Sequence, residues 1–208
     1  MRRRDAVKAL ALTSVTPKLL FTPPSFAAKN SISLAESDFS SDWQNWPDML
    51  WVGPEYWGNR LQDWEIRSGR AVCNVNGKNR ALHALPCQLS EQNGSFETQV
   101  QAEMLRPISP ERLTSGYLGF RIGAKGNFED YRSAAVFGKG LDAGFDTNGK
   151  LFIGDSQGEV VVDTRQPVLL KLQAKPVRKT YTLTLTASDE SENELATLTK
   201  EAVPPESL

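Results

Sequence analysis

All five tryptophans of this 208-residue chain lie between residues 43 and 64, and this cluster is the feature most able to do chemistry. Exposed aromatic rings stack on the apolar faces of sugars, while neighbouring polar side chains bind the hydroxyls. The stretch supplies both kinds of group, which predicts a polysaccharide or glycan as the partner. The candidate ligand-binding residues are Trp43, Trp46, Trp51, Tyr56, Trp57, Asn59, Arg60 and Asp63.

The same tryptophans have a structural interpretation, in which most of the rings cover the core of the domain. Both interpretations hold if Trp43 and Trp46 are exposed while Trp57 and Trp64 are buried. Prolines and glycines interrupt the stretch, so it cannot form one regular helix. We therefore expect residues 43–64 to form a long structured loop against a sheet.

Catalytic candidates are few. His83 is the only histidine, so it cannot build a two-metal phosphoesterase centre, and we expect it to be structural in a strand over 81–85. A Ser-His-Asp triad is disfavoured for the same reason. Glu97 and Glu103 share one face of a predicted strand, but about 20 Å separates them. This is too far for the paired carboxylates of a glycosidase.

A calcium ion is the one cofactor that the sequence leaves open. Four oxygen-bearing residues gather around a predicted hairpin turn, although their spacing is not that of an EF-hand: Asp142, Asp146, Asn148 and Asp155. The two cysteines leave alternatives open as well. A turn over 76–79 would pair Cys73 near Leu82 and leave Cys87 out of register, which favours two buried thiols over a disulfide.

The first 28 residues have the pattern of an export signal. A basic head containing Arg3 and Arg4 precedes a mildly apolar stretch, and small residues allow cleavage after Ala27, with Ala28 as the alternative. The paired arginines are similar to a twin-arginine signal, with an ordinary secretory signal as the alternative. The apolar stretch is too short and too polar to span a bilayer. We expect the mature chain to be periplasmic or extracellular, without a membrane anchor after cleavage.

The remaining residues, 29–208, fit one all-β domain. The formal net charge of the whole chain is −1 and no basic cluster follows the signal, so nucleic acid is excluded as a partner. Short runs with a period of two, separated by turn residues, predict a two-sheet antiparallel β-sandwich. The expected strands cover 96–104, 117–123, 131–137, 143–145, 150–153, 159–163, 168–175, 179–187 and 194–200, with turns at 146–149, 155–158 and 176–178. Helical turns are expected only near 48–50 and 110–113.

Five stretches together carry a resemblance to a known family: 51–64, 119–123, 130–134, 140–144 and 149–155. They resemble the N-terminal region of exported bacterial alkaline phosphatase D (PhoD-type) proteins. The resemblance implies a concanavalin A or laminin-G type jelly roll, followed in the family by a large metallophosphoesterase domain. It also implies closing strands after residue 200. No catalytic residue of the family has a counterpart in this chain.

We therefore expect a non-catalytic exported β-sandwich module that binds carbohydrate. One alternative is a fragment of a metallophosphoesterase whose catalytic domain lies beyond residue 208. A glycan hydrolase of the same sandwich shape is the other, disfavoured by the missing carboxylate pair. We also expect the sandwich to be truncated at its C-terminus, with an unpaired sheet edge at 194–200 that lowers stability and favours association.

Overall fold

The computed structural model describes residues 9–12, 18–19, 37–75, 77, 80–87, 94–105, 116–123 and 140–208. These residues form antiparallel strands, with 3₁₀ turns as the helical elements among them. The all-β class and the two-sheet sandwich predicted from the sequence are confirmed. The predicted strand at 131–137, the motif at 130–134 and the helical turn at 110–113 lie outside the described residues.

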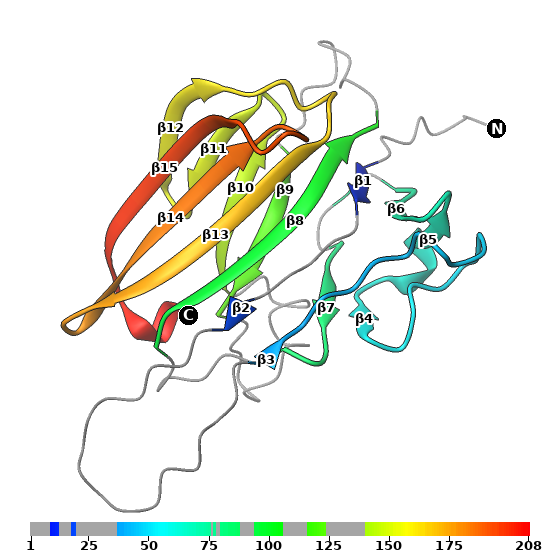
Figure 1. The fold of residues 1–208 in the computed structure, drawn as a ribbon, viewed down its shortest axis with the longest axis horizontal. Helices are drawn as coiled ribbons and strands as arrows, with labels where there is room; N and C mark the ends of the chain where they lie inside the picture. Colours follow the sequence, from blue (N-terminus) through cyan, green and yellow to red (C-terminus); the bar gives the residue numbers. More distant parts are fainter. Residues whose placement is uncertain are drawn as a thin grey trace, which may run out of the picture.

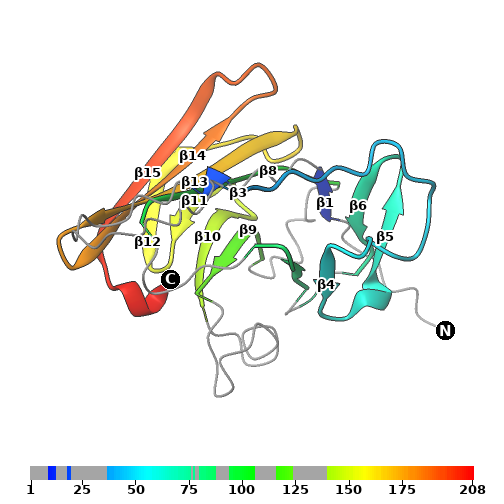
Figure 2. The ribbon, with the colours of Figure 1, turned by 60° about the horizontal axis from the view of Figure 1, so that its bottom comes forward.

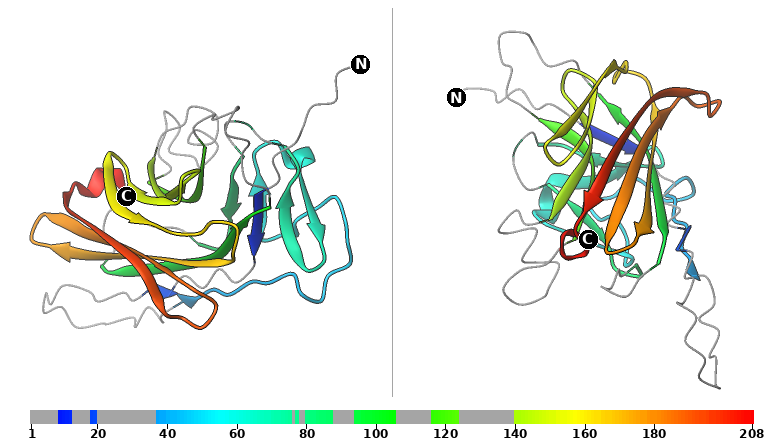
Figure 3. Two further views of the ribbon diagram at one scale, coloured as in Figure 1. Left: turned by 90° about the horizontal axis from the view of Figure 1, so that it is seen from above. Right: turned by 90° about the vertical axis from the view of Figure 1, so that its left-hand side faces the viewer.

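Two antiparallel sheets form the sandwich (Figure 1). The smaller sheet has the strand order β12-β11-β10-β9, and its strands are β9 (Tyr117–Ile122), β10 (Leu141–Asp146), β11 (Lys150–Ile153) and β12 (Ser156–Val161). The facing part of the larger sheet has the order β15-β14-β13-β8, and its strands are β8 (Phe96–Met104), β13 (Val168–Val177), β14 (Thr180–Ser188) and β15 (Glu194–Val203). The two layers are seen in the left view of Figure 3.

The sandwich core lies between these layers and is built from alternate residues of the strands. Phe145 on β10, Leu170 on β13 and Leu183 on β14 are each fully buried in it. The period of two predicted over 96–104 is confirmed, since Phe96 is buried in this core and Val100 and Met104 pack against it. Alternation therefore sets which face of each strand is apolar, and burial of those faces holds the layers together.

Two predicted turns are displaced. The turn between β11 and β12 is formed by Gly154 and Asp155, so β12 begins at Ser156 instead of after a turn at 155–158. Gly154 has a φ of 59°, a conformation that glycine adopts without steric cost. The hairpin between β13 and β14 turns after Val177, because Pro176 is still paired with Tyr181.

The edge expected at residues 194–200 is present, because β15 has β14 as its only neighbour among the described strands. The segment after β15 packs back onto the sandwich through a 3₁₀ turn, Pro205–Ser207. Leu208 packs against the core, and the Ser207 carbonyl lies against Gly123 at the end of β9. Residues 204–208 therefore cover one end of the core.

The tryptophan-rich region forms a second small core at the end of the sandwich away from the β13–β14 turn (Figures 1 and 2). Its elements are β4 (Tyr56–Gly58), the 3₁₀ turn Leu61–Asp63, β5 (Trp64–Arg67), β6 (Arg70–Cys73) and β7 (Leu82–Ala84). The helical turn expected near 48–50 is absent, because Met49 makes a β-bridge with Ile66.

The pairing predicted for Cys73 is wrong. β6 pairs with β5, which places Cys73 opposite Trp64, while Leu82 lies on β7 and pairs with β4. A tight turn at Ser68 and Gly69 joins β5 directly to β6, so the hairpin forms before the predicted turn is reached. Both cysteines are free; Cys73 is buried as expected, whereas Cys87 is only partly buried.

The larger sheet continues from β8 through β1 (Ala9–Leu12) to β6 and β5, and it also contains two short strands, β2 (Lys18–Leu19) and β3 (Ser37–Asp38). β1 lies between β8 and β6 and pairs with both, so it joins the sandwich to the tryptophan-rich region. The ion pair between Arg70 on β6 and Glu103 on β8 spans the same junction, with a 3.4 Å separation. The predicted signal residues Arg3, Arg4 and Ala27 lie outside the described residues.

Candidate functional site

Trp43 is buried, so the prediction that it is exposed is wrong. Its side chain is 4% exposed, its indole N–H donates a 2.8 Å hydrogen bond to the Val52 carbonyl, and its ring packs on Tyr56 at 5.1 Å. Tyr56 is buried too, and this burial raises its pKa to about 12. Both residues therefore belong to the small core and cannot form an open binding surface.

Trp46 and Trp51 form the exposed part of the tryptophan cluster. Trp51 is 44% exposed, Trp46 is half-buried, and their ring centroids are 6.1 Å apart. Trp46 lies over Gly53, where an added Cβ would be 3.0 Å from the Trp46 ring. Leu50, which directly precedes Trp51 in the chain, is 78% exposed. We call Trp46, Leu50 and Trp51 the loop surface.

The other predicted ligand residues lie elsewhere in the same region. Asp63 makes an ion pair of 2.9 Å with Arg80, and both side chains are mostly buried. The carboxylate therefore stabilises the local structure. Trp57 is half-buried against the His83 ring on the adjacent strand, at 5.5 Å. Of the remaining two, Asn59 is half-buried and Arg60 exposed. The eight predicted residues thus do not form one continuous surface.

The catalytic candidates have structural partners. His83 lies on β7 between Leu82 and Ala84, as the strand prediction required. Glu97 accepts a hydrogen bond from Gln173 and pairs with Lys171, while Glu103 pairs with Arg70 at the other end of β8. The two glutamates therefore bind different strands of the sheet. Burial raises the pKa of both thiols, Cys73 and Cys87, which disfavours the nucleophilic thiolate.

The predicted calcium ligands have partners of their own. In the part of the chain that the structure describes, no three His, Cys, Asp or Glu side chains are grouped to hold a metal ion. One Asp146 oxygen accepts the backbone N–H groups of Asn148 and Lys150, at 2.8 and 3.0 Å, which shapes the β10–β11 turn. Asp155 is exposed and paired with Lys200, and this hydrogen bond lowers its pKa.

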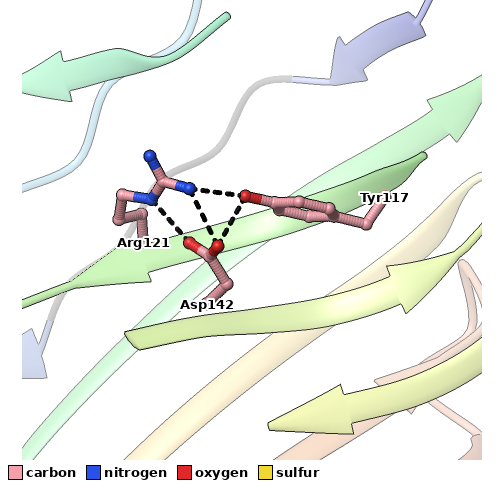
Figure 4. Close-up of polar contacts among 3 residues, drawn as sticks. All are labelled: Tyr117, Arg121 and Asp142. Carbon is pink, nitrogen blue, oxygen red and sulfur yellow. Dashed lines mark hydrogen bonds and ion pairs between the residues drawn. The ribbon is translucent and has the colours of Figure 1, made fainter. Parts of the chain in front are cut away.

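The fourth of these residues, Asp142, belongs to a cluster on the smaller sheet that sequence reasoning missed (Figure 4). Its two carboxylate oxygens accept 2.6 and 2.8 Å hydrogen bonds from the guanidinium of Arg121. The Tyr117 hydroxyl donates to the same carboxylate at 2.6 Å and accepts from Arg121 at 2.7 Å. Bidentate pairs of this kind are among the strongest hydrogen-bonded contacts in proteins.

Burial of part of the ring, together with the Asp142 carboxylate, raises the pKa of Tyr117 to about 12. The hydroxyl is therefore protonated, and able to donate, at any physiological pH. The signal that could have found this cluster is the alternation of Tyr117 and Arg121 on one strand, which places both on one face. Its partner Asp142 lies near a predicted hairpin turn, where the sequence pattern leaves a calcium site open instead.

Comparisons with protein families, with curated proteins and with solved structures find no match for this chain. Within the described ranges, no helix is long and apolar enough to cross a membrane.

Proposed function

We propose that the chain is an exported, non-catalytic β-sandwich module that binds glycans through the loop surface. The observation that carries this proposal is the exposed Trp51 ring beside Trp46. Large aromatic side chains are normally buried, and one that is held open next to a second ring offers a face on which a sugar can stack. Because Trp46 packs over Gly53, the Trp46 ring beside Trp51 is ordered before the ligand arrives.

Export and the absence of catalysis are part of the same proposal. The paired arginines and the small residues near Ala27 support export, and a jelly-roll topology of the PhoD type remains what the resemblance implies. Replacing Arg3 and Arg4 by lysine in a reporter fusion should block export, and unimpaired export would contradict a twin-arginine route. The purified mature chain should not hydrolyse phosphate esters with or without divalent metal; turnover that copurifies with homogeneous protein would contradict this.

Glycan binding is tested by affinity electrophoresis in gels that contain xylan, mannan or a mixed-linkage β-glucan. We expect at least one of these polysaccharides to retard the chain and to shift its tryptophan fluorescence. Trp51→Ala should remove the retardation. Val160→Ala is the matched control, because Val160 is also apolar and exposed (53%) but lies on β12 in the smaller sheet.

Two results would overturn the proposal. The first is that none of the three polysaccharides retards the wild-type chain. The second is that Trp51→Ala migrates like Val160→Ala in a gel that retards the wild type. Trp43 is unsuitable for this test, since removing its buried ring would disturb the small core.

A further inference from the structure

We propose that the outer face of the smaller sheet carries a second binding site, at Tyr117, which accepts a neutral pyranose ring. This site uses none of the residues of the loop surface, so its test is independent of the function proposed above. The four observations that carry it are the alternation of β9, a pair of facing glycines, an ordered and half-exposed ring, and a charge-balanced polar group beside that ring.

Alternation on β9 separates the core from the outer face. Leu118 and Phe120 pack against the sandwich core, so Tyr117, Gly119 and Arg121 face the other way. The register with β10 places Asp146 opposite Tyr117, Gly144 opposite Gly119 and Asp142 opposite Arg121. The outer face therefore has large side chains at both ends of this segment and none in the middle pair.

The two facing glycines have no side chain that could occupy the space between these ends. An added Cβ at Gly119 would collide with the Ala143 carbonyl, and one at Gly144 with the Leu118 carbonyl, so neither position tolerates a larger residue without moving a strand. The Tyr117 hydroxyl contacts Arg121 and Asp142. These two residues form the next outer-face pair beyond the glycines. Its ring therefore spans the glycine pair, and Figure 4 shows it extending along the strands towards the two charged side chains.

The Tyr117 ring is both ordered and accessible. Two hydrogen bonds hold its hydroxyl, and the Phe152 ring meets it edge-to-face at 5.3 Å, yet Tyr117 is 48% exposed. Fixing a side chain usually opposes binding, because its rotational freedom is lost when the ligand arrives. Here the contacts on the sheet have already fixed the ring, so stacking a ligand on it carries a smaller entropic cost.

The polar group beside the ring indicates the ligand class. Arg121 and Asp142 cancel each other's charge, which removes the attraction for a strongly anionic or cationic ligand. A carboxylate offers about four acceptor positions, and the hydrogen bonds described for Asp142 use three of them. An apolar face next to a carboxylate acceptor matches a neutral pyranose, which has C–H groups on one face and hydroxyls around its rim.

The test uses the full mature chain labelled with 3-fluorotyrosine. The sequence contains four tyrosines, so the ¹⁹F spectrum has four signals, and Tyr117→Phe assigns the one from Tyr117. The probes are the methyl glycosides of β-galactose, α-glucose and α-mannose, titrated into the millimolar range. We expect at least one of them to shift the Tyr117 signal saturably while the other three signals stay in place.

Variants separate this site from the loop surface and from a purely structural role. Asp142→Asn keeps the shape of the side chain, and we expect binding to weaken about tenfold, the effect of losing one charge-assisted hydrogen bond. Trp51→Ala should leave the titration unchanged. Tyr117→Ala should abolish binding, observed by saturation-transfer NMR of the sugar, provided that its thermal midpoint shows a folded chain.

The proposal is overturned if no probe shifts the Tyr117 signal, or if Asp142→Asn binds the sugar as well as the wild type. A titration lost in Trp51→Ala and kept in Asp142→Asn would assign the sugar to the loop surface instead. If Tyr117→Ala does not fold, the wild-type fluorine titration and the Asp142→Asn variant still decide whether the sugar binds at Tyr117.

Discussion

The sandwich and the tryptophan-rich region bury their apolar side chains in different ways. The sandwich core takes alternate residues from long strands such as β13 and β14, and most of them are aliphatic. The core of the tryptophan-rich region combines residues from loops and four short strands, and its largest members are aromatic, namely Trp43, Tyr56 and Trp64. No residue belongs to both clusters.

The two regions therefore bury their core side chains to a similar extent by different means. In the sandwich, backbone pairing repeats along each strand, so no single side chain determines the arrangement. In the tryptophan-rich region, pairing is short and individual side chains replace it, as when the Trp43 indole N–H satisfies the Val52 carbonyl. All five tryptophans lie in this second region, so tryptophan fluorescence reports on it alone, while far-UV circular dichroism reports mainly on the sandwich.

The largest effect is expected from Phe145→Ala in the sandwich core. Phe145 is fully buried, and removing its ring leaves a cavity between two sheets that cannot collapse easily. The free energy of unfolding should fall by about 4–5 kcal/mol. Urea titration followed by circular dichroism should show this loss, with a smaller shift in the fluorescence transition. Identical shifts by both probes would show that the two cores unfold as one unit.

Trp43→Ala is the reciprocal experiment in the tryptophan-rich region. It removes a buried ring and leaves the Val52 carbonyl without its donor, so we expect a loss of about 3–4 kcal/mol. The loss should appear mainly in the fluorescence transition. Trp43→Phe, which keeps an aromatic ring but not the donor, is the control and should cost less. A Trp43→Ala variant with unchanged fluorescence stability would contradict the burial described here.

Alkaline pH should weaken both regions, because each has one tyrosine with a pKa raised to about 12, Tyr56 and Tyr117. The unfolded chain binds the proton less tightly, with an ordinary pKa near 10. The stabilisation is therefore fully present below pH 10 and is lost as the pH rises towards 12. We expect about 2 kcal/mol for buried Tyr56 and less for half-exposed Tyr117. Urea titrations at pH 9 and 11.5, repeated with Tyr56→Phe and Tyr117→Phe, check this; a loss that persists undiminished in the double variant would have another origin.

The smallest effect on stability is expected from Trp51→Ala. Its side chain is already 44% exposed, so the free energy of unfolding should change by no more than about 0.5 kcal/mol. Chemical denaturation against the wild type measures this. A loss as large as that of Trp43→Ala would mean that Trp51 supports the core and would remove the basis for a loop surface.

The contrast between the two regions also sets what the sequence could predict. β8 follows from the alternation of its residues, because period-two patterns depend on neighbours along the chain. The burial of Trp43 depends on Val52 and Tyr56, which reach it through loops without periodicity, so its exposure was predicted wrongly. The site at Tyr117 required the register of β9 against β10, which brings Asp142 beside Arg121 and which local patterns do not specify.

β1 connects the architecture of the sheet with the export proposed above. Ala9–Leu12 pairs with both β6 and β8, yet it lies inside the segment that the sequence predicts to be removed on export. A translocase that recognises Arg3 and Arg4 would have to draw this strand out of the sheet, so folding and recognition compete for the same four residues. A cut after Ala27 would then leave two facing strand edges open, and the Arg70–Glu103 ion pair would still bridge them. The rate of export would then depend on how strongly β1 is bound between β6 and β8.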